Sequence, residues 1–140
     1  MLFPSVNFLA VILAALTNMV IGFAWYSPYL LGKPWMRLMG FTAKTLAAAQ
    51  ASMGGLYGLS FVAAIIQASV IGVILKMAYV QTLDSAIILG GILWLGLVAV
   101  TQFTGEIFSN KPFNPHLLAI NTGYQLASIL AMAVILFSLK

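Results

Sequence analysis

The chain has 140 residues, of which 63% are hydrophobic and only 6% are charged, and its mean hydropathy is +1.10. So few charged side chains cannot cover a soluble globule of 15.0 kDa, whereas a lipid bilayer requires polarity only at its two faces. The net charge of +4 comes from scattered Lys and Arg residues, so we expect no nucleic-acid partner. With no cysteine and a single histidine, the sequence predicts no disulfide, no metal site and no cofactor.

Four apolar runs are each close to the ~20 residues that a helix needs to cross the hydrocarbon layer. No Lys or Arg precedes the first run, and no small-residue cleavage site follows it, so we expect a retained helix and not a signal peptide. The predicted fold is all-α, an integral membrane four-helix bundle that forms a single transmembrane domain over residues 1–140. Its spans are expected at 6–26, 56–80, 85–108 and 115–139.

Capping residues mark the starts of two of these spans. Asp84 is expected to cap the third helix, because a carboxylate oxygen can accept from the first free N–H groups. Asn114 followed by Pro115 is typical of an N-cap and a first helical residue, and predicts the start of the fourth helix.

The segment 27–55 is the only substantial part outside the spans. In it the basic residues Lys33, Arg37 and Lys44 alternate with apolar side chains such as Trp35. Long basic side chains can reach lipid headgroups while their apolar neighbours sink below them, which predicts a short interfacial helix between the first and second spans. Thr42 is expected to restart a helix after it. A plain connector is the alternative interpretation.

The distribution of basic residues in the loops predicts the orientation in the cell membrane. Positive charge concentrates in cytoplasmic loops, so a multi-pass protein is expected with its N- and C-termini on the non-cytoplasmic side. The residues expected on the cytoplasmic side are Lys33, Arg37, Lys44 and Lys111, against Lys76 and Lys140 on the other.

Polar residues within the spans are few, and each needs a partner in the bilayer. On the first helix, a stripe of small and amide side chains that includes Asn18 and Gly22 is expected to face protein. Helical spacing places further polar residues in about the same cytoplasmic half of the membrane. The candidate ligand- or ion-binding residues of this polar layer are Asn18, Gln102, Glu106, Asn121, Tyr124 and Gln125.

This polar layer has two interpretations. In the first, Glu106 binds a proton or a cation, and the amides position the passing species. In the second, the amides hydrogen-bond neighbouring helices, and Glu106 pairs with Lys111 or with a basic residue of the first inner loop. If Asn18 and Asn121 face the same interior, the first and fourth helices must be neighbours.

Small residues recur on the second span at a spacing that lets helices approach closely. The partner could be a helix of the same chain, a second copy or a larger membrane complex. These helix-packing residues are Gly54, Gly58, Ala64, Ala68 and Gly72.

No pattern for catalysis is present. The lone His116 is interpreted as a headgroup or capping residue, because a metal would need several further donors nearby. No G-x-S-x-G elbow occurs, and no nucleophile and base form a plausible pair, so we do not expect an enzyme.

One string combines rare residues at fixed spacing: W-Y-S-P-x-x-x-G-K-x-W, followed far downstream by I-N-x-G-Y. In these features, which cover nearly the whole chain, the sequence resembles the bacterial membrane family of domain of unknown function 1761. The resemblance implies a small four-helix membrane protein and supplies no reaction. The string would also anchor the loop at the interface. Its residues are Trp25, Tyr26, Ser27, Pro28, Gly32, Lys33 and Trp35, and those of the downstream match include Asn121, Gly123 and Tyr124.

Two functional hypotheses follow from the residues. The first is a protein that binds or translocates an ion or small molecule through the polar layer. The second is a structural or accessory subunit that self-associates, as a homo-oligomer, or docks onto a larger membrane complex through its small-residue faces.

Overall fold

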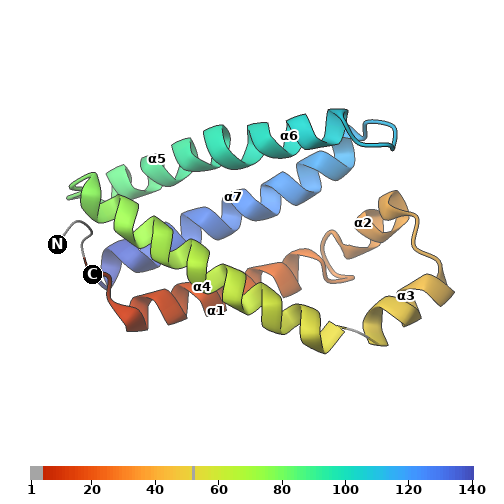
Figure 1. The fold of residues 1–140 in the computed structure, drawn as a ribbon, viewed down its shortest axis with the longest axis horizontal. Coiled ribbons are helices and arrows are strands. Elements are labelled where there is room, and N and C mark those ends of the chain that lie inside the picture. Colours follow the sequence, from red (N-terminus) through yellow and green to blue (C-terminus); the bar gives the residue numbers. More distant parts are fainter. Residues whose placement is uncertain (1–4, 52) are drawn as a thin grey trace.

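The computed structural model describes residues 5–51 and 53–140, which are built mainly from helices and contain no strand. Four helices are long and apolar enough to cross a membrane (Figure 1). They begin and end within three residues of the predicted limits. The prediction of an all-α, four-helix membrane protein is therefore confirmed. The four are α1 (Phe8–Trp25), α4 (Met53–Met77), the continuous third helix made of α5 (Leu83–Leu93), a π-helical turn (Trp94–Ala99) and α6 (Val100–Ile107), and α7 (Pro115–Ser138).

The observed caps agree with one expectation and correct the other. Asn114 caps α7, because its side-chain oxygen accepts from the N–H groups of His116 and Leu117 at 3.1 Å. The cap of α5 is Thr82, whose hydroxyl oxygen accepts from the N–H of Ser85, and the expectation that Asp84 does this was wrong. Asp84 lies in the first turn, where the positive end of the helix dipole still stabilises its carboxylate.

Between α1 and α4 the chain forms the expected short helix and, after it, a second short helix. The helix α2 (Gly32–Met39) ends at Gly40, which adopts a left-handed conformation with φ of 77°. The helix α3 (Ala43–Ala51) then begins after Thr42, which exchanges hydrogen bonds with Thr45. Thr42 thus restarts the helix as expected, and the left-handed Gly40 separates the two pieces.

The helix α7 lies at the centre of the bundle. Helices α1, α4 and α5 all pack against it, and α1 also packs along α4. The buried core is accordingly rich in small side chains, which allow close helix approach. It contains Ala10, Val11, Ala14, Ala68, Ile71, Leu75, Ala86, Ile129, Met132, Ala133 and Leu136.

The small residues of α4 divide into two groups. Ala64, Ala68 and Gly72 are buried within the chain, and an ideal Cβ on Gly72 would lie 2.7 Å from the side chain of Val6. Gly54 and Gly58 are exposed with open space above them. Only the first group therefore packs helices together within one chain.

The chain ends and the inter-helix loops sort to opposite ends of the bundle. The start of α1, the turn after α4 and the end of α7 gather at one end (Figure 1). There Asn7 donates to the carbonyl oxygen of Leu139 at 2.6 Å. The helices α2 and α3 and the loop after α6 lie toward the other end. This grouping matches the one on which the orientation was predicted, and the membrane side of each end stays a prediction.

The loop after α1 is closed by backbone hydrogen bonds around Ser27. Its carbonyl oxygen accepts from the N–H groups of Leu30 and Gly32, and Leu31 donates to the carbonyl of Trp25. Gly32 is buried here, and an ideal Cβ would lie 2.3 Å from the oxygen of Tyr26 and 2.6 Å from that of Ser27. Only glycine fits, because the obstructing atoms belong to the backbone.

We therefore predict that Gly32→Ala destabilises the protein by roughly 1–3 kcal/mol, the usual cost of forcing a methyl group into filled space. Thermal unfolding in detergent, followed by circular dichroism, measures the change. Gly58→Ala is the matched control, because nothing lies within 4 Å of an added Cβ there. Equal melting temperatures for Gly32→Ala and the parent would contradict this description of the loop.

Candidate functional site

The first part of the candidate site is a buried hydrogen-bond group between α1 and α7. Asn18 on α1 is 8% exposed, and its side-chain oxygen accepts from the hydroxyl of Tyr124 at 2.7 Å. The hydroxyl of Ser128, one turn further along α7 and fully buried, donates to the same oxygen. Two donors occupy the two lone pairs of this amide oxygen.

A second hydrogen bond joins the same two helices, but here the tyrosine is on the α1 side and the asparagine is on α7. Tyr26 follows the end of α1, and its hydroxyl donates to the side-chain oxygen of Asn121 on α7 at 2.8 Å. Each helix thus offers a tyrosine to an asparagine of the other. The two tyrosine rings meet edge to face with centroids 5.5 Å apart.

Two indole groups extend the connection to α7. The ring nitrogen of Trp25 donates to the carbonyl of Ile120 at 2.9 Å, and that of Trp94 in the π-helical turn donates to the carbonyl of Thr122 at 2.8 Å. An ideal Cβ on Gly123 would lie 3.1 Å from the Trp25 ring. The absence of a side chain at Gly123 leaves room for the indole ring beside the α7 backbone.

The motif residues therefore hold the fold together. Trp25 and Tyr26 bind α7, Ser27 donates its hydroxyl to the carbonyl of Ala24, and Trp35 on α2 lies edge to face with Tyr26 at 5.2 Å. Pro28 and Lys33 are exposed and take no part in these contacts.

The structure brings three of the predicted polar-layer residues to one interface, namely Asn18, Asn121 and Tyr124. The expectation that α1 and α7 are neighbours is confirmed. Asn18 and Asn121 do not bond one another, since each is taken by a tyrosine. Gln125 is half-buried on α7 and takes no part in these bonds.

Gln102 and Glu106 lie one turn from each other on α6 and take no part in these hydrogen bonds. The side-chain oxygen of Gln102 is enclosed and has no hydrogen-bond donor. The carboxylate of Glu106 forms no ion pair with Lys111 or with another residue in 5–51 and 53–140. In the polar layer, the side-chain oxygens of Asn18 and Asn121 thus accept hydrogen bonds from hydroxyl groups, whereas Gln102 and Glu106 keep unused acceptors.

Sequence reasoning missed the aromatic donors. Tyr26 and Trp94 were not assigned partners, although an indole N–H or a phenol O–H that is placed in a bilayer must donate to something. The available signal was the position of Trp25 and Tyr26 at the end of one span and of Asn121 near the start of another.

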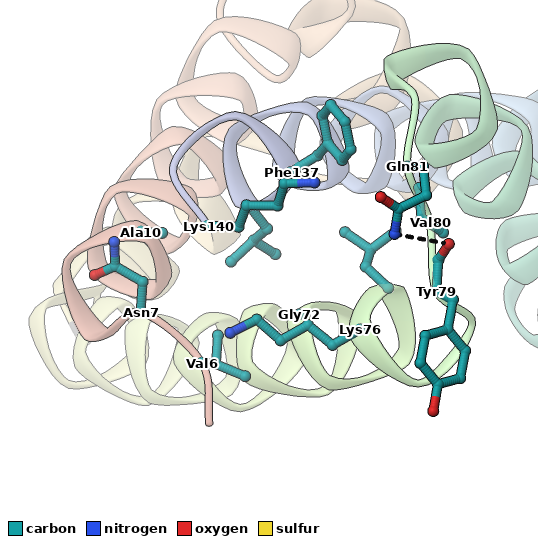
Figure 2. A pocket seen from close by; sticks show the side chains of 12 residues that line it. Val6, Asn7, Ala10, Gly72, Lys76, Tyr79, Val80, Gln81, Phe137 and Lys140 are labelled. Atoms are coloured by element: carbon teal, nitrogen blue, oxygen red, sulfur yellow. Dashed lines mark hydrogen bonds between the residues drawn. The ribbon is translucent and has the colours of Figure 1, made fainter. Parts of the chain in front are cut away.

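One cavity lies at the end of the bundle that holds the chain ends (Figure 2). It has a volume of about 160 Å³ and is bordered by α1, α4, α7 and the turn after α4. Three of its polar side chains interact with other groups of the chain. Lys76 donates to the carbonyl of Ser5, Gln81 donates to that of Tyr79 at 3.3 Å, and the Lys140 ammonium lies 4.2 Å from the centre of the Phe137 ring.

A second cavity is an open groove of about 400 Å³ between α2 and α7. Arg37 and His116 contribute its charged and polar side chains, and the other residues are apolar. None of the predicted polar-layer residues lines either of these two cavities. The groove is lined by Leu31, Pro34, Arg37, Leu38, His116, Ala119 and Ile120.

Comparison with known proteins identifies the family to which the chain is similar. The family described as "Protein of unknown function (DUF1761)" matches residues 9–137, which is nearly the whole chain. No curated protein and no solved structure matches the chain.

We predict that Tyr124 couples more strongly with Asn18, its hydrogen-bond partner, than with Asn121. Tyr124→Phe should cost on the order of 1 kcal/mol, a common value for an interhelical hydrogen bond in a membrane protein. In double-mutant cycles measured by unfolding in detergent, Tyr124→Phe and Asn18→Leu should couple, whereas the coupling between Tyr124→Phe and Asn121→Leu should be weaker, because it passes only through the contact of the Tyr26 and Tyr124 rings. Tyr29→Phe is the control, because Tyr29 is 95% exposed. Additive effects for Tyr124 with Asn18 would contradict the assigned bond.

Proposed function

The chain belongs to DUF1761, a family of unknown function, and on this premise we propose that it is a structural membrane subunit that associates with a second copy of itself through its third helix. We place it in the cell membrane with both termini on the non-cytoplasmic side. The observation that carries the proposal is the incomplete burial of the third helix. In its most apolar 18-residue window only 11% is buried, against 28% in each of the other three helices.

The low burial has a simple cause, which is that the third helix packs mainly on α7 alone. Ala86 and Gly90 are the buried residues of α5, Gly90 lies against α7, and Leu89 packs partly against the core. The opposite face carries Ile88, Ile92 and Leu95, which are 62%, 61% and 58% exposed. Gly91 and Gly96 beside this face have nothing within 4 Å of an added Cβ.

A second copy is the occupant that we propose for this face. Helices associate in bilayers where small residues allow close backbone approach, and an apolar helix face can pair with its own copy around a two-fold axis. Such a pairing is also compatible with the hydrogen bonds of Asn18 and Asn121. Their side-chain oxygens accept from hydroxyl groups of the same chain and so hold the single subunit together.

We predict that single cysteines at Ile88, Ile92 and Leu95 form disulfide-linked dimers in membranes after mild oxidation. The chain has no cysteine of its own, so each dimer reports one position. Val62, Ile66 and Val70 on α4 are matched controls, because they are similarly exposed and also follow helical steps. Cross-linking should be strong on the third helix and weak on α4.

Two results would contradict the proposal. One is equal cross-linking on α4 and on the third helix, which would reflect random collision in the bilayer. The other is a monomer in native mass spectrometry from mild detergent, together with no dimer from any third-helix cysteine.

A second candidate function is the binding or translocation of a cation or a proton, and the unused acceptors on α6 favour it. The enclosed oxygen of Gln102 lies one turn from the unpaired carboxylate of Glu106. Amide and carboxylate oxygens are the ligands that hard cations prefer, and an intramembrane carboxylate can carry a proton.

If this second function holds, Glu106→Gln should abolish cation- or proton-dependent flux in proteoliposomes, read with a pH-sensitive or sodium-sensitive dye. Asp84→Asn is the control, because Asp84 is the other acidic residue of the chain and lies at the start of the third helix. Flux that is equal in parent and Glu106→Gln, or absent from both, would exclude Glu106 as the carrier.

A further inference from the structure

The third helix carries exposed apolar side chains on both sides of its π-helical turn. Up to Leu95 they are the open face described above, and on α6 the side chains of Val100, Phe103 and Ile107 are exposed as well. On each side of the turn they follow steps of three and four residues, which is the spacing of one face of an α-helix. The complete row is Ile88, Ile92, Leu95, Val100, Phe103 and Ile107.

The π-helical turn accounts for the one step in the row that differs. Leu95 and Val100 are five residues apart, and in an α-helix at about 100° per residue this step would turn Val100 about 140° away from Leu95. Here the N–H of Val100 donates to the carbonyl of Leu95, so five residues close one turn, as four do in an α-helix. The row therefore stays on one face of the third helix across the turn.

The same turn moves the polar residues of α6 off that face. From Leu95, an unbroken α-helix would continue the row at steps of four and three residues through Ala99, Gln102 and Glu106. In the structure Gln102 and Glu106 are half-buried, and the other residues of α6 are exposed. The turn thus replaces an amide and a carboxylate on the open face by apolar side chains.

Contacts with α7 hold the turn in this rotation. The indole N–H of Trp94, its first residue, donates to the carbonyl of Thr122 at 2.8 Å. Val98 in the same turn packs partly against the core, and both the turn and α6 pack against α7. These contacts fix which side of the turn faces α7 and therefore which side of α6 is open.

We propose that the π-helical turn sets the rotation of α6 so that the open face of the third helix is apolar along its length, and that the second copy packs along all of it. The inference rests on the self-association proposed above and names the residues of that interface. From Ile88 to Ile107 the row is roughly 28 Å long at ~1.5 Å per residue, close to the ~30 Å of the hydrocarbon layer.

Two features of the row favour a second copy as its partner. Gly91 and Gly96 beside it have nothing within 4 Å of an added Cβ, so a partner helix can approach closely. The rotation also keeps Glu106 away from the two-fold contact. Two carboxylates brought together there would repel one another in a medium where even one is costly.

Single-cysteine cross-linking in membranes distinguishes the two possible rotations of α6, because the chain has no cysteine of its own. The first set of variants lies on the proposed face, and we expect each to give disulfide-linked dimers after mild oxidation. This set is Val100→Cys, Phe103→Cys and Ile107→Cys. The matched set carries cysteine at the positions that an unbroken α-helix would present, and we expect a loss of dimer in each. This set is Ala99→Cys, Gln102→Cys and Glu106→Cys.

Ile88→Cys separates this inference from the self-association on which it rests. Dimers from Ile88→Cys and from the first set, with none from the matched set, support the proposal. Dimers from Ile88→Cys and the matched set, or equal dimers from both sets, overturn the rotation and leave the self-association standing. Dimers from Ile88→Cys alone overturn the length of the interface. No dimer from any third-helix cysteine contradicts the self-association, and this inference with it.

A deletion tests the turn without a second copy. Deleting Gly96 removes one residue from the π-helical turn, which can then close as an α turn while α6 keeps its rotation, so we expect a melting temperature within a few degrees of the parent. Deleting Val70 is the matched control. Val70 is exposed between the buried Ala68 and Gly72 of α4, so its loss rotates one part of that buried face by about 100° and should abolish cooperative unfolding. Equal damage from the two deletions would overturn the proposed role of the turn.

Discussion

The structure depends on the need to pair every polar group that enters the bilayer. In a hydrocarbon medium an unsatisfied hydroxyl or amide is costly, so a few polar side chains can fix how helices meet. Here Asn18 accepts from Tyr124 and Ser128, while Tyr26 donates to Asn121 in the opposite direction. The bonds of Asn18 and the bond of Asn121 lie at different positions along the helices. Together they therefore fix the rotation of α1 against α7 and its position along the helix axis.

The other helices pack around the pair that α1 and α7 form. The helix α4 adds its Ala64, Ala68 and Gly72 face, and α5 adds Gly90, which lies against Ile129 and Ala133. The same arrangement exhausts the oxygens of the α1–α7 interface and leaves the third helix covered on one side. Oxygens without partners then remain on α6, and an apolar face remains on α5. The self-association and the cation binding that we propose would both use the third helix.

Much of this fold could be predicted from local sequence. Apolar length gave the spans, Asn114 with Pro115 gave the start of α7, and the helical spacing of Asn18 gave the buried face of α1.

Partners across helices could not be predicted, because they depend on rotation and axial offset. The sequence grouped Gln102 and Glu106 with Asn18, and it did not show that Asn18 accepts from two hydroxyl groups whereas Gln102 has an enclosed oxygen without a donor. Thr82 and Asp84 are both good caps, and only the path of the turn after α4 selects Thr82. Gly54 and Gly58 continued the four-residue spacing of small residues but lie beyond the packed part of α4.

The rotation of the third helix on α7 is the central claim, because it determines which face is left open. An ideal Cβ on Gly90 lies 3.5 Å from that of Ala133, within the ~3.5–4.5 Å that a disulfide requires, whereas nothing lies within 4 Å of an added Cβ on Gly91. The direct measurement is intrachain disulfide formation in membranes by two double variants of this cysteine-free chain. Gly90→Cys with Ala133→Cys should close a bond within one chain, and Gly91→Cys with Ala133→Cys should not. Equal or preferred closure in the Gly91 pair would mean that the helix is rotated and that the open face is a different one.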